Sequence, residues 1–384
     1  MNSQTLLLRP VDAWFFRDGR PYNKLEGNQV SVESEFPPAP ATLVGAIRAA
    51  LARERGWNGS GKWSGELATV LGDGFENLGQ LSFSGPWLVR KNRDVLESLF
   101  PAPLNLVGQA LTERSQAQWA PRALLVPGEK VRCDFGEVCL PVPNRRDAGT
   151  LKDAGGLWIT GSGLEKVLAG EPPAREQLAP TRDLWHHEFR VGLVRDESKR
   201  TTGEQEHALY SPSYIRLRPG VSLALEVRGL QEGWRIPDIF PLGGEGRLAT
   251  CKTAPTLALP RAPAEAIRKS KRLSVTLLTP LAMPLQDQRA VHPTAGEEVP
   301  GLPGAKIVSG CVGRPWRLGG WDSLNLRPLP LAPFFPPAST WFCEASPEAI
   351  ERTLKLHGRN VGPCAAYGFG RMVLGTWNNE GVAL

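Results

Sequence analysis

The opening of the chain contains the pattern that most restricts its possible folds. Residues 5–11 are mostly apolar and end in a turn-forming Pro-Val-Asp sequence, which is typical of a short buried strand. A polar stretch follows at 17–35. Apolar residues then recur at helical spacing from Leu43 to Arg55, with prolines in front of them and Gly56 as a stop signal. The sequence therefore predicts a strand, a long loop and an amphipathic helix.

A strand, a loop and a helix in this order open ferredoxin-like folds, whose βαββαβ scaffold is also used by RNA-recognition domains. The 41 glycines and 35 prolines favour many turns and short strands in the rest of the chain. A length of 384 residues suits two domains. A proline-rich, basic passage precedes a new predicted strand at 273–278, so we expect domains at 1–265 and 266–384. The predicted fold class is α+β, with two ferredoxin-like, RRM-like domains carrying glycine-rich loops and insertions.

Further elements follow from the same hydrophobic and capping patterns. They are a loop at 113–122, a helix at 163–169 and a hairpin made by 189–194 and 208–217, with a polar tip at 195–207. Nearer the end, a helix is predicted at 346–357, with Ser346 as N-cap, and a final strand at 371–377.

The sequence lacks the signatures of common enzymes and metal sites. It contains no GxSxG, HExxH or Walker pattern, and no GxGxxG that opens a helix after a strand. Of the five histidines only His186 and His187 are adjacent, and neighbours on a strand point to opposite faces. The six cysteines form no CxxC pair, so we expect reduced thiols and neither zinc nor a disulfide framework. We therefore predict no enzyme activity, no metal and no cofactor.

The charge of the chain allows a polyanionic partner. A formal net charge of +6 and a pI near 9.1 favour phosphate binding, although many unrelated soluble proteins share such values. No run of about 18 apolar residues is present, and the first residues do not have the pattern of a secretion signal. We therefore expect a cytoplasmic protein without membrane contact.

The sequence FFRDGRP at 15–21 is the first candidate RNA-binding segment. Asp18 and Gly19 indicate a turn that displays Arg17 and Arg20 beside two phenylalanines, and Lys24 follows in the same polar stretch. Guanidinium groups next to aromatic rings can bind phosphate and stack on bases. The alternative is an ordinary turn in which Arg17 pairs with a nearby carboxylate.

The predicted helix after residue 40 is the second candidate. Gly45 is expected on its first turn, where free amide groups attract phosphate, and Arg48 follows one turn later. Equally, Gly45 could serve only to let the helix lie close to a sheet.

Two glycine-rich segments are the third candidate. In YGFGR, Gly368 and Gly370 precede Arg371 at the start of the last strand, and PLGGEGR places Gly244 close to Arg247 in the same manner. Glycines let a phosphodiester approach backbone amides and a guanidinium group. The alternative is a glycine bulge in an edge strand.

The order of these segments resembles the RAMP superfamily of CRISPR proteins, and within it the family of third subunits of the type III-B (Cmr) effector complex. The similar parts are PVDAWFFRDGRPYN, FPPAPATLVGAIRAAL, FRVGLVRDESKRTTGEQEHALYSPSYIRL, PLGGEGRLA and YGFGR. The resemblance implies two ferredoxin-like domains, one of them degenerate, with glycine-rich loops crossing the path of the RNA. The tip at 195–207 resembles a thumb that inserts between guide and target.

The resemblance also implies a role in antiviral defence. A protein of this family holds the 5′ tag of the CRISPR RNA at the foot of the complex, beside the large polymerase-like subunit and the first backbone subunit, and meets target RNA only indirectly. Target cutting and nucleotide cyclisation belong to those neighbours, so this chain is expected to position RNA.

Two alternatives remain open at this level. The first is a RAMP endoribonuclease that processes CRISPR transcripts with His186 or His187 as acid or base. The second is a protein-assembly subunit that does not touch RNA, because the 12 tryptophans of the chain favour protein interfaces.

Overall fold

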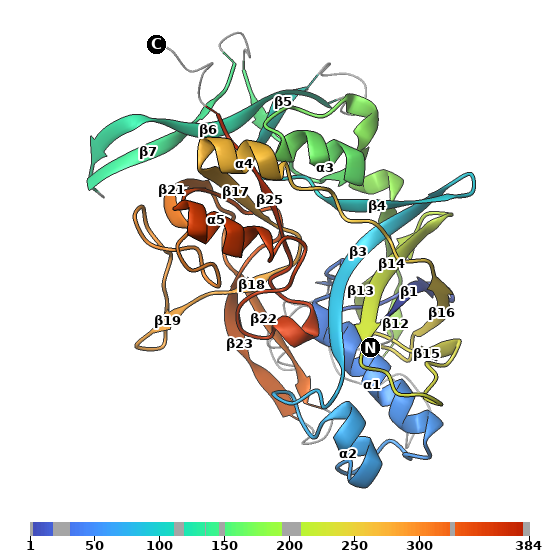
Figure 1. The fold of residues 1–384 in the computed structure, drawn as a ribbon. Helices are drawn as coiled ribbons and strands as arrows, with labels where there is room; N and C mark the ends of the chain where they lie inside the picture. The colour runs from blue at the N-terminus through green and yellow to red at the C-terminus, as the bar shows by residue number, and fades with distance from the viewer. Residues whose placement is uncertain are drawn as a thin grey trace.

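A computed structural model of the chain describes residues 3–17, 31–110, 119–134, 136–145, 150–193, 209–322 and 327–378. Its largest sheet is antiparallel and has eight strands in the order β10-β9-β4-β3-β14-β1-β16-β15 (Figure 1). The bounds of these strands are β1 Ser3–Pro10, β3 Ser82–Asn92, β4 Val95–Pro101, β9 Leu157–Thr160, β10 Leu178–Pro180, β14 Val221–Arg228, β15 Ile239–Pro241 and β16 Leu248–Ala254.

Strand β1 lies in the middle of this sheet and forms because its residues alternate between two buried faces. Leu6 pairs with Leu225 of β14 on one side and with Thr253 of β16 on the other. Leu6 and Leu8 are fully buried against the face that carries α1, whereas Leu7 packs on the opposite face.

Helix α1 (Pro40–Glu54) confirms the helix predicted from the sequence. Pro40 occupies its first position, and Gly56 follows the end of the helix with a φ of +87°. Leu43, Ile47 and Leu51 recur at a spacing of four residues and are buried against the sheet. The short helix α2 (Gly65–Leu71) lies beside α1.

A second sheet, also antiparallel, has four strands in the order β21-β24-β17-β25. It is covered by the helices α4 and α5, and its buried residues form a separate core cluster. The bounds are α4 Ala264–Ser270, β17 Arg272–Leu277, β21 Lys306–Cys311, β24 Thr340–Glu344, α5 Pro347–Leu354 and β25 Met372–Gly375. The predicted N-cap of α5 is confirmed, because the Ser346 hydroxyl accepts a hydrogen bond from the amide of Ala349.

The two sheets share one strand order over four of their strands. In the first, β14 lies between β1 and β3, and β16 lies on the far side of β1; in the second, β24 lies between β17 and β21, and β25 lies beyond β17. Helix α1 belongs to the connection from β1 to β3, and α5 to the connection from β24 to β25. The remaining crossings, residues 229–247 and 278–305, contain no α-helix. In each four-stranded unit, therefore, only one of these two connections contains an α-helix, in a mixed α/β chain of antiparallel sheets.

Several smaller elements complete the fold. Strands β12 and β13 pair, which confirms the arms of the predicted hairpin, while its tip at 195–207 lies outside the described residues. The loop predicted at 113–122 is wrong for its last residues, because β6 begins at Trp119. The other bounds are β2 Ser31–Val32, β5 Leu106–Ala110, β6 Trp119–Cys133, β7 Gly136–Pro143, β8 Lys152–Asp153, α3 Gly161–Leu168, β11 Trp185–Phe189, β12 Gly192–Leu193, β13 Leu209–Leu217, β18 Leu281–Ala282, β19 Leu285–Gln286, β20 Arg289–Ala290, β22 Trp316–Asp322, β23 Arg327–Phe335, and the 3-10 turns η1 Arg175–Gln177, η2 Thr181–Asp183 and η3 Ala365–Tyr367.

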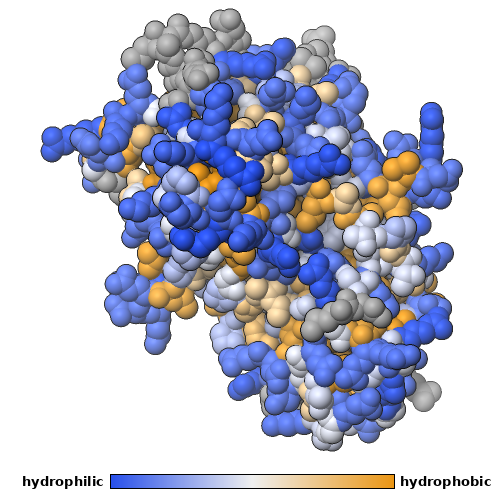
Figure 2. All heavy atoms as spheres, viewed as in Figure 1, coloured by the Kyte–Doolittle hydropathy of each residue, from blue (hydrophilic) through white to orange (hydrophobic). Residues whose placement is uncertain are grey.

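The two units are joined by shared cores. Phe334, Tyr367 and Phe369 belong to the same buried cluster as Trp14 and α1. The surface in Figure 2 is largely hydrophilic, with scattered apolar patches. Among the described residues no helix is both long and apolar enough to cross a membrane. The domain division near residue 265, which coincides with the start of α4, stays a prediction.

Candidate nucleic-acid interface

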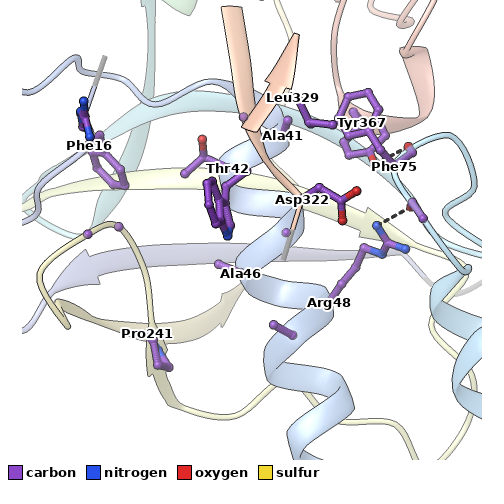
Figure 3. A pocket seen from close by; sticks show the side chains of 18 of the residues that line it. Phe16, Ala41, Thr42, Ala46, Arg48, Phe75, Pro241, Asp322, Leu329 and Tyr367 are labelled. Carbon is purple, nitrogen blue, oxygen red and sulfur yellow. Dashed lines mark hydrogen bonds between the residues drawn. The ribbon is translucent and has the colours of Figure 1, made fainter. Parts of the chain in front are cut away.

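A cavity of about 500 Å³ lies at the meeting point of the two units (Figure 3). The first unit contributes the segment after β1, one face of α1, the stretches before and after α2, and the glycine loop after β15. The second unit contributes the end of the β22–β23 hairpin and the turn η3. The lining residues are Phe15, Phe16, Arg17, Ala41, Thr42, Gly45, Ala46, Arg48, Ala49, Trp57, Trp63, Gly74, Phe75, Pro241, Gly243, Gly244, Gly320, Trp321, Asp322, Leu329 and Tyr367.

The FFR segment forms one wall of the cavity. Phe15 and Phe16 are both buried, and the amide of Glu35 donates a hydrogen bond to the Phe16 carbonyl at 2.9 Å. Arg17 follows with an exposed side chain at the rim, where its backbone forms a bridge with Ser34. Arg17 thus follows two buried phenylalanines, whereas the turn predicted at Asp18 and Gly19 lies outside the described residues. Of the predicted RNA contacts, Arg20 and Lys24 lie outside the described residues.

The PLGGEGR loop docks on the same segment. The amide of Gly244 donates a hydrogen bond to the Phe15 carbonyl at 2.8 Å, and a Cβ on Gly243 would lie 2.6 Å from that oxygen. Arg247, in contrast, does not line the cavity: its guanidinium lies over the ring of Tyr214, 4.2 Å from the ring centroid. RNA contact by Gly244 or Arg247 stays a prediction.

Behind this loop lies an ion-pair cluster at the base of the β12–β13 hairpin. Arg190 and Arg216 each donate hydrogen bonds to both Asp12 and Glu188, and Arg247 lies 3.5 Å from Asp12. The hydrogen bond from Arg216 lowers the pKa of Glu188 to about 2, and those from Arg190 and Arg216 lower the pKa of Asp12. The carboxylates therefore hold these three arginines in fixed positions.

Helix α1 supplies a floor of small side chains. Ala41, Thr42, Gly45, Ala46 and Ala49 lie on the face that lines the cavity. The expectation that Gly45 sits on the first turn is wrong, because α1 begins at Pro40 and Gly45 is its sixth residue. Its amide is thus inside the helical hydrogen-bond ladder and not among the free donors of the N-terminus. A Cβ at Gly45 would meet no atom within 4 Å, so the helix faces open space there.

Arg48 shapes the cavity from inside the protein. Its side chain is buried, and its guanidinium donates hydrogen bonds to the carbonyls of Leu71, Gly74 and Asn77 at 2.7, 3.0 and 3.2 Å. The same group lies 4.9 Å from the ring centroid of Trp63. Burial lowers the pKa of Arg48. The structure thus assigns Arg48 to holding the end of α2 and the next loop, while RNA contact by Arg48 stays a prediction.

A stacked aromatic pair closes the side of the cavity next to Arg48. The rings of Phe75 and Tyr367 lie 4.8 Å apart, and the Tyr367 hydroxyl donates a hydrogen bond to the Phe75 carbonyl (Figure 3). Burial raises the pKa of Tyr367 to about 12, so this hydroxyl keeps its proton at neutral pH. Tyr367 is the first residue of YGFGR, and within that segment it is the part that reaches the cavity.

The rest of YGFGR packs inside the protein. Gly368 and Gly370 have positive φ, and a Cβ on them would lie 2.5 Å from the Gly85 oxygen and 2.1 Å from the Val361 oxygen, respectively. Their amides donate hydrogen bonds to the carbonyls of Ala365 and Pro280. These glycines are required for close backbone packing, and RNA contact by them stays a prediction.

Arg371 joins the second unit to the first. Its side chain is buried, lies over the ring of Trp87 and reaches within 3.8 Å of the Glu226 carboxylate. Burial lowers the pKa of Arg371 to about 10. The Nε and Nη1 atoms of Arg371 have no hydrogen-bond partner among the described residues. Arg371 thus links β14 to the start of β25. RNA contact by Arg371 stays a prediction.

The β22–β23 hairpin was not predicted as part of the site. Its end brings Asp322 and Leu329 close to α1, although they lie far from α1 in the sequence (Figure 3), and Trp321 lines the same cavity. The available signal was the alternation of arginine, tryptophan and glycine at 314–321, a composition typical of surfaces that stack on single strands.

None of the four described histidines lines the cavity. The Nδ1 of His187 is 2.8 Å from the Ser213 hydroxyl. Within the described ranges no group of three His, Cys, Asp or Glu side chains could hold a metal ion.

Comparisons with known proteins add to this geometry. A family described as CRISPR-associated protein (Cas_Cmr3) matches residues 6–377. No curated protein matches the sequence. Among solved structures, the chain is similar to a chain of Type III-B Cmr-beta bound to cognate target RNA and AMPPnP, at 14% identity over 88% of this chain and 86% of that chain, with a TM-score of 0.48. A chain of Type III-B Cmr-beta bound to cognate target RNA matches at 15% identity over the same shares, with a TM-score of 0.47.

Proposed function

The chain belongs to the Cmr3 family of CRISPR-associated proteins, as its sequence predicted, and from this we propose that it is a non-catalytic RNA-binding subunit of a type III-B CRISPR effector complex. In antiviral defence it holds the 5′ tag of the CRISPR RNA. Its neighbours in this proposal are the large polymerase-like subunit and the backbone subunit, and it meets target RNA only through the assembled complex.

The cavity between the two units is the observation that supports an RNA-holding role. Segments that are distant in sequence, including parts of all three candidates that we singled out for RNA binding, line one space. Single-stranded RNA is bound by stacking its unpaired bases on aromatic side chains beside a positive rim. The cavity combines aromatic walls with the exposed Arg17 at its edge.

The proposal includes the fold of both units. We propose that each is a ferredoxin-like domain in which one of the two crossing helices is absent. The shared strand order supports this assignment, since a later strand lies between the first two strands in both sheets. The inserted β6–β7 ribbon and the β12–β13 hairpin then extend from a common scaffold.

A complex reconstituted with labelled CRISPR RNA tests the RNA-holding role. We expect the labelled 5′ tag to cross-link to this subunit. Arg17→Ala should weaken binding and reduce the slope of log K against log salt by about 0.7, the value for one phosphate contact on a single strand. Arg268→Ala is the matched control, because Arg268 is an exposed arginine of α4 that pairs with Glu351.

Two results would contradict the proposal. If the tag does not cross-link to this subunit, a protein-assembly role replaces RNA holding. If the purified chain cuts repeat RNA specifically without added metal, the protein is an endoribonuclease, and His186→Ala and His187→Ala would then identify the acid or base.

A further inference from the structure

We propose that a second cavity, in the segment between β18 and β21, receives a lysine side chain of a neighbouring protein in the effector complex. This inference goes beyond the proposed function, because it concerns a protein contact in a different part of the chain. The cavity has a volume of about 310 Å³ and is open to solvent. Its lining residues are Pro284, Val291, Pro293, Glu297, Glu298, Val299, Pro300, Gly301, Leu302 and Pro303.

The second cavity lies apart from the first. The two share no described residue, and the loop that carries β19 lies on the side of the second unit away from α1 (Figure 1). The connection from β17 to β21 corresponds in strand order to the connection from β1 to β3, which contains α1. In place of a helix, the second unit thus has an irregular, proline-rich segment that encloses a surface site.

The walls of the second cavity are apolar and rigid. Four of its ten lining residues are prolines, whose rings fix the backbone. The amide of Val291 donates a hydrogen bond to the Pro284 carbonyl at 2.9 Å. Val299 and Leu302 are only 2% and 1% exposed and belong to the core cluster of the second unit. A preformed space of this kind avoids much of the entropy cost of ordering a site on binding.

Two adjacent carboxylates give the second cavity its charge. Glu297 and Glu298 are the only charged residues in its described lining, so the lining is negative although the whole chain carries +6. One oxygen of each is held by the backbone. The Oε2 of Glu297 accepts a hydrogen bond from the amide of Thr294 at 2.6 Å, and the Oε1 of Glu298 accepts one from the amide of Gly304 at 2.8 Å.

The other oxygen of each carboxylate is available to a ligand. Within the described ranges, neither Glu297 nor Glu298 forms an ion pair. Lys306 is the backbone partner of Glu298, but their side chains form no ion pair with each other. Each carboxylate can therefore accept a further hydrogen bond, and a cation placed between them would reduce their mutual repulsion.

A lysine side chain matches both the walls and the charge. Its long apolar stem can lie along apolar residues while its charged end stays at the opening. An ammonium group has three donors and can reach one oxygen on each of two carboxylates. The planar fork of arginine, in contrast, is suited to both oxygens of one carboxylate, and in each glutamate one oxygen already accepts a backbone hydrogen bond.

The surroundings of the cavity favour a protein as the source of the amine. Leu285, the neighbour of Pro284 on β19, is 60% exposed. A small free amine would leave this side chain in water, whereas a protein surface that supplies the lysine can also bury it.

The first experiment treats a reconstituted effector complex with a water-soluble carbodiimide, which joins a carboxylate to a contacting lysine amine with loss of water. Mass spectrometry should find Glu297 or Glu298 joined to a lysine of a neighbouring subunit. The double variant Glu297→Gln/Glu298→Gln should lose this link, because carbodiimide does not activate an amide. Its midpoint in urea unfolding should be unchanged, since the glutamine carbonyls accept the same backbone hydrogen bonds.

The second experiment measures the affinity of the labelled full chain for the complex assembled without it. We expect Glu297→Gln/Glu298→Gln to weaken binding by about tenfold, the effect of two partly exposed ion pairs. A higher salt concentration should reduce this difference. Glu232→Gln/Glu265→Gln is the matched control, because it removes two exposed carboxylates outside the cavity, and it should change the affinity by less than about twofold.

A third variant tests the space of the cavity separately from its charge. Val291→Trp keeps both carboxylates and fills the cavity from one wall, so it should also weaken binding by about tenfold. Val291→Ile adds one methylene group and is its control, with an expected change of less than about twofold.

The outcomes separate this inference from the proposed function. If no carbodiimide link forms and neither the double glutamine variant nor Val291→Trp changes the affinity, the cavity is not a docking site. If the linked lysine belongs to this chain, the proposal is also wrong. If the affinity falls without a link, the occupant is not lysine. Cross-linking of the RNA tag is measured independently, so the failure of either proposal leaves the other standing.

Discussion

Gly45 in the first four-stranded unit and the YGFGR glycines in the second serve opposite purposes near one cavity. Gly45 of the first unit lies on a helix face where an added Cβ would meet nothing within 4 Å, whereas Gly368 and Gly370 of the second unit lie against backbone oxygens. The first glycine leaves room for a ligand, and the other two leave room for the chain itself. The same residue type in a motif can thus belong either to a binding surface or to the packing that supports it.

Helices α1 and α5 of the two units also differ in their relation to the cavity. The first unit keeps α1 between its first two strands, and this helix forms the floor of the cavity. The second unit keeps α5, which covers its own sheet, and it reaches the cavity through the β22–β23 hairpin and η3. The first unit therefore forms the floor of the cavity and the second unit covers it, and four experiments compare the two units.

The largest effect is expected from Gly370→Ala in the second unit. Its φ is +70° and the new Cβ would lie 2.1 Å from the Val361 carbonyl oxygen, so the backbone must shift. We expect a loss of about 3 kcal/mol in the free energy of unfolding, measured by urea titration of the full chain. An unchanged midpoint would mean that the YGFGR segment is not packed as described.

A pair of buried arginines gives the next test. Arg48→Met leaves three buried carbonyls without their donor, and we expect it to cost about 2 kcal/mol. Arg371→Met should cost less, about 1 kcal/mol, because that guanidinium already has unpartnered nitrogens and its carboxylate neighbour keeps a hydrogen bond from Arg228. Arg53→Met, on the exposed side of α1, is the control. If Arg48→Met and Arg371→Met reduce the free energy of unfolding equally, the two buried arginines do not differ in the way predicted here.

The ion-pair cluster of the first unit predicts an acid-dependent loss of stability. The pKa of Glu188 is lowered from 4.5 to about 2 in the folded protein, so its contribution is complete above pH 4.5 and disappears as the pH falls through 2. Its side chain is 27% exposed and screened by water, so we expect Glu188→Gln to cost only about 1 kcal/mol at pH 7.

The measurement is urea unfolding from pH 7 down to pH 2. The free energies of unfolding of Glu188→Gln and of the unchanged protein should converge at low pH. Glu351→Gln in the second unit is the comparison, since its pair with Arg268 is about half exposed on both sides and should matter less. A constant difference between Glu188→Gln and the unchanged protein at all pH values would contradict the assignment.

The smallest effect is expected from Gly45→Ala, and it has the opposite sign. Alanine favours a helix over glycine by up to about 1 kcal/mol, and nothing in the cavity obstructs its methyl group. Thermal unfolding should therefore occur at a slightly higher temperature, with tag binding unchanged. A destabilised Gly45→Ala variant would show that the face of α1 is filled.

Elements with strong local signals were predictable from the sequence. The prolines before α1 and the glycine after it define that helix, and Ser346 defines the start of α5. The β22–β23 hairpin and α4 were missed, because glycines and prolines interrupt the first and a proline-rich basic passage conceals the second. Such elements form through long-range pairing and packing, which local propensity does not record.

The candidate site was predictable in its parts but not in their roles. The sequence identified FFR, the glycine loops and α1 as candidates for phosphate binding, each beside a purely structural alternative. The structure brings parts of these segments together around a cavity with aromatic walls. It buries the side chains of Arg48 and Arg371, which contact neighbouring segments of the protein. Trp321 belongs to a stretch rich in arginine, tryptophan and glycine, but its place in the cavity, like that of Asp322, depends on a hairpin that folds back over α1.

The sequence by itself determined the family of this protein, the elements with strong local signals and some of the segments that line its cavity. Local spacing, capping residues and the order of motifs are properties of the chain alone. Only the tertiary structure decided which glycine faces open space and which faces backbone, and which arginine reaches the rim. The physical reason is that these outcomes depend on contacts between residues far apart in the sequence, such as Gly85 with Gly368 and Asp322 with α1.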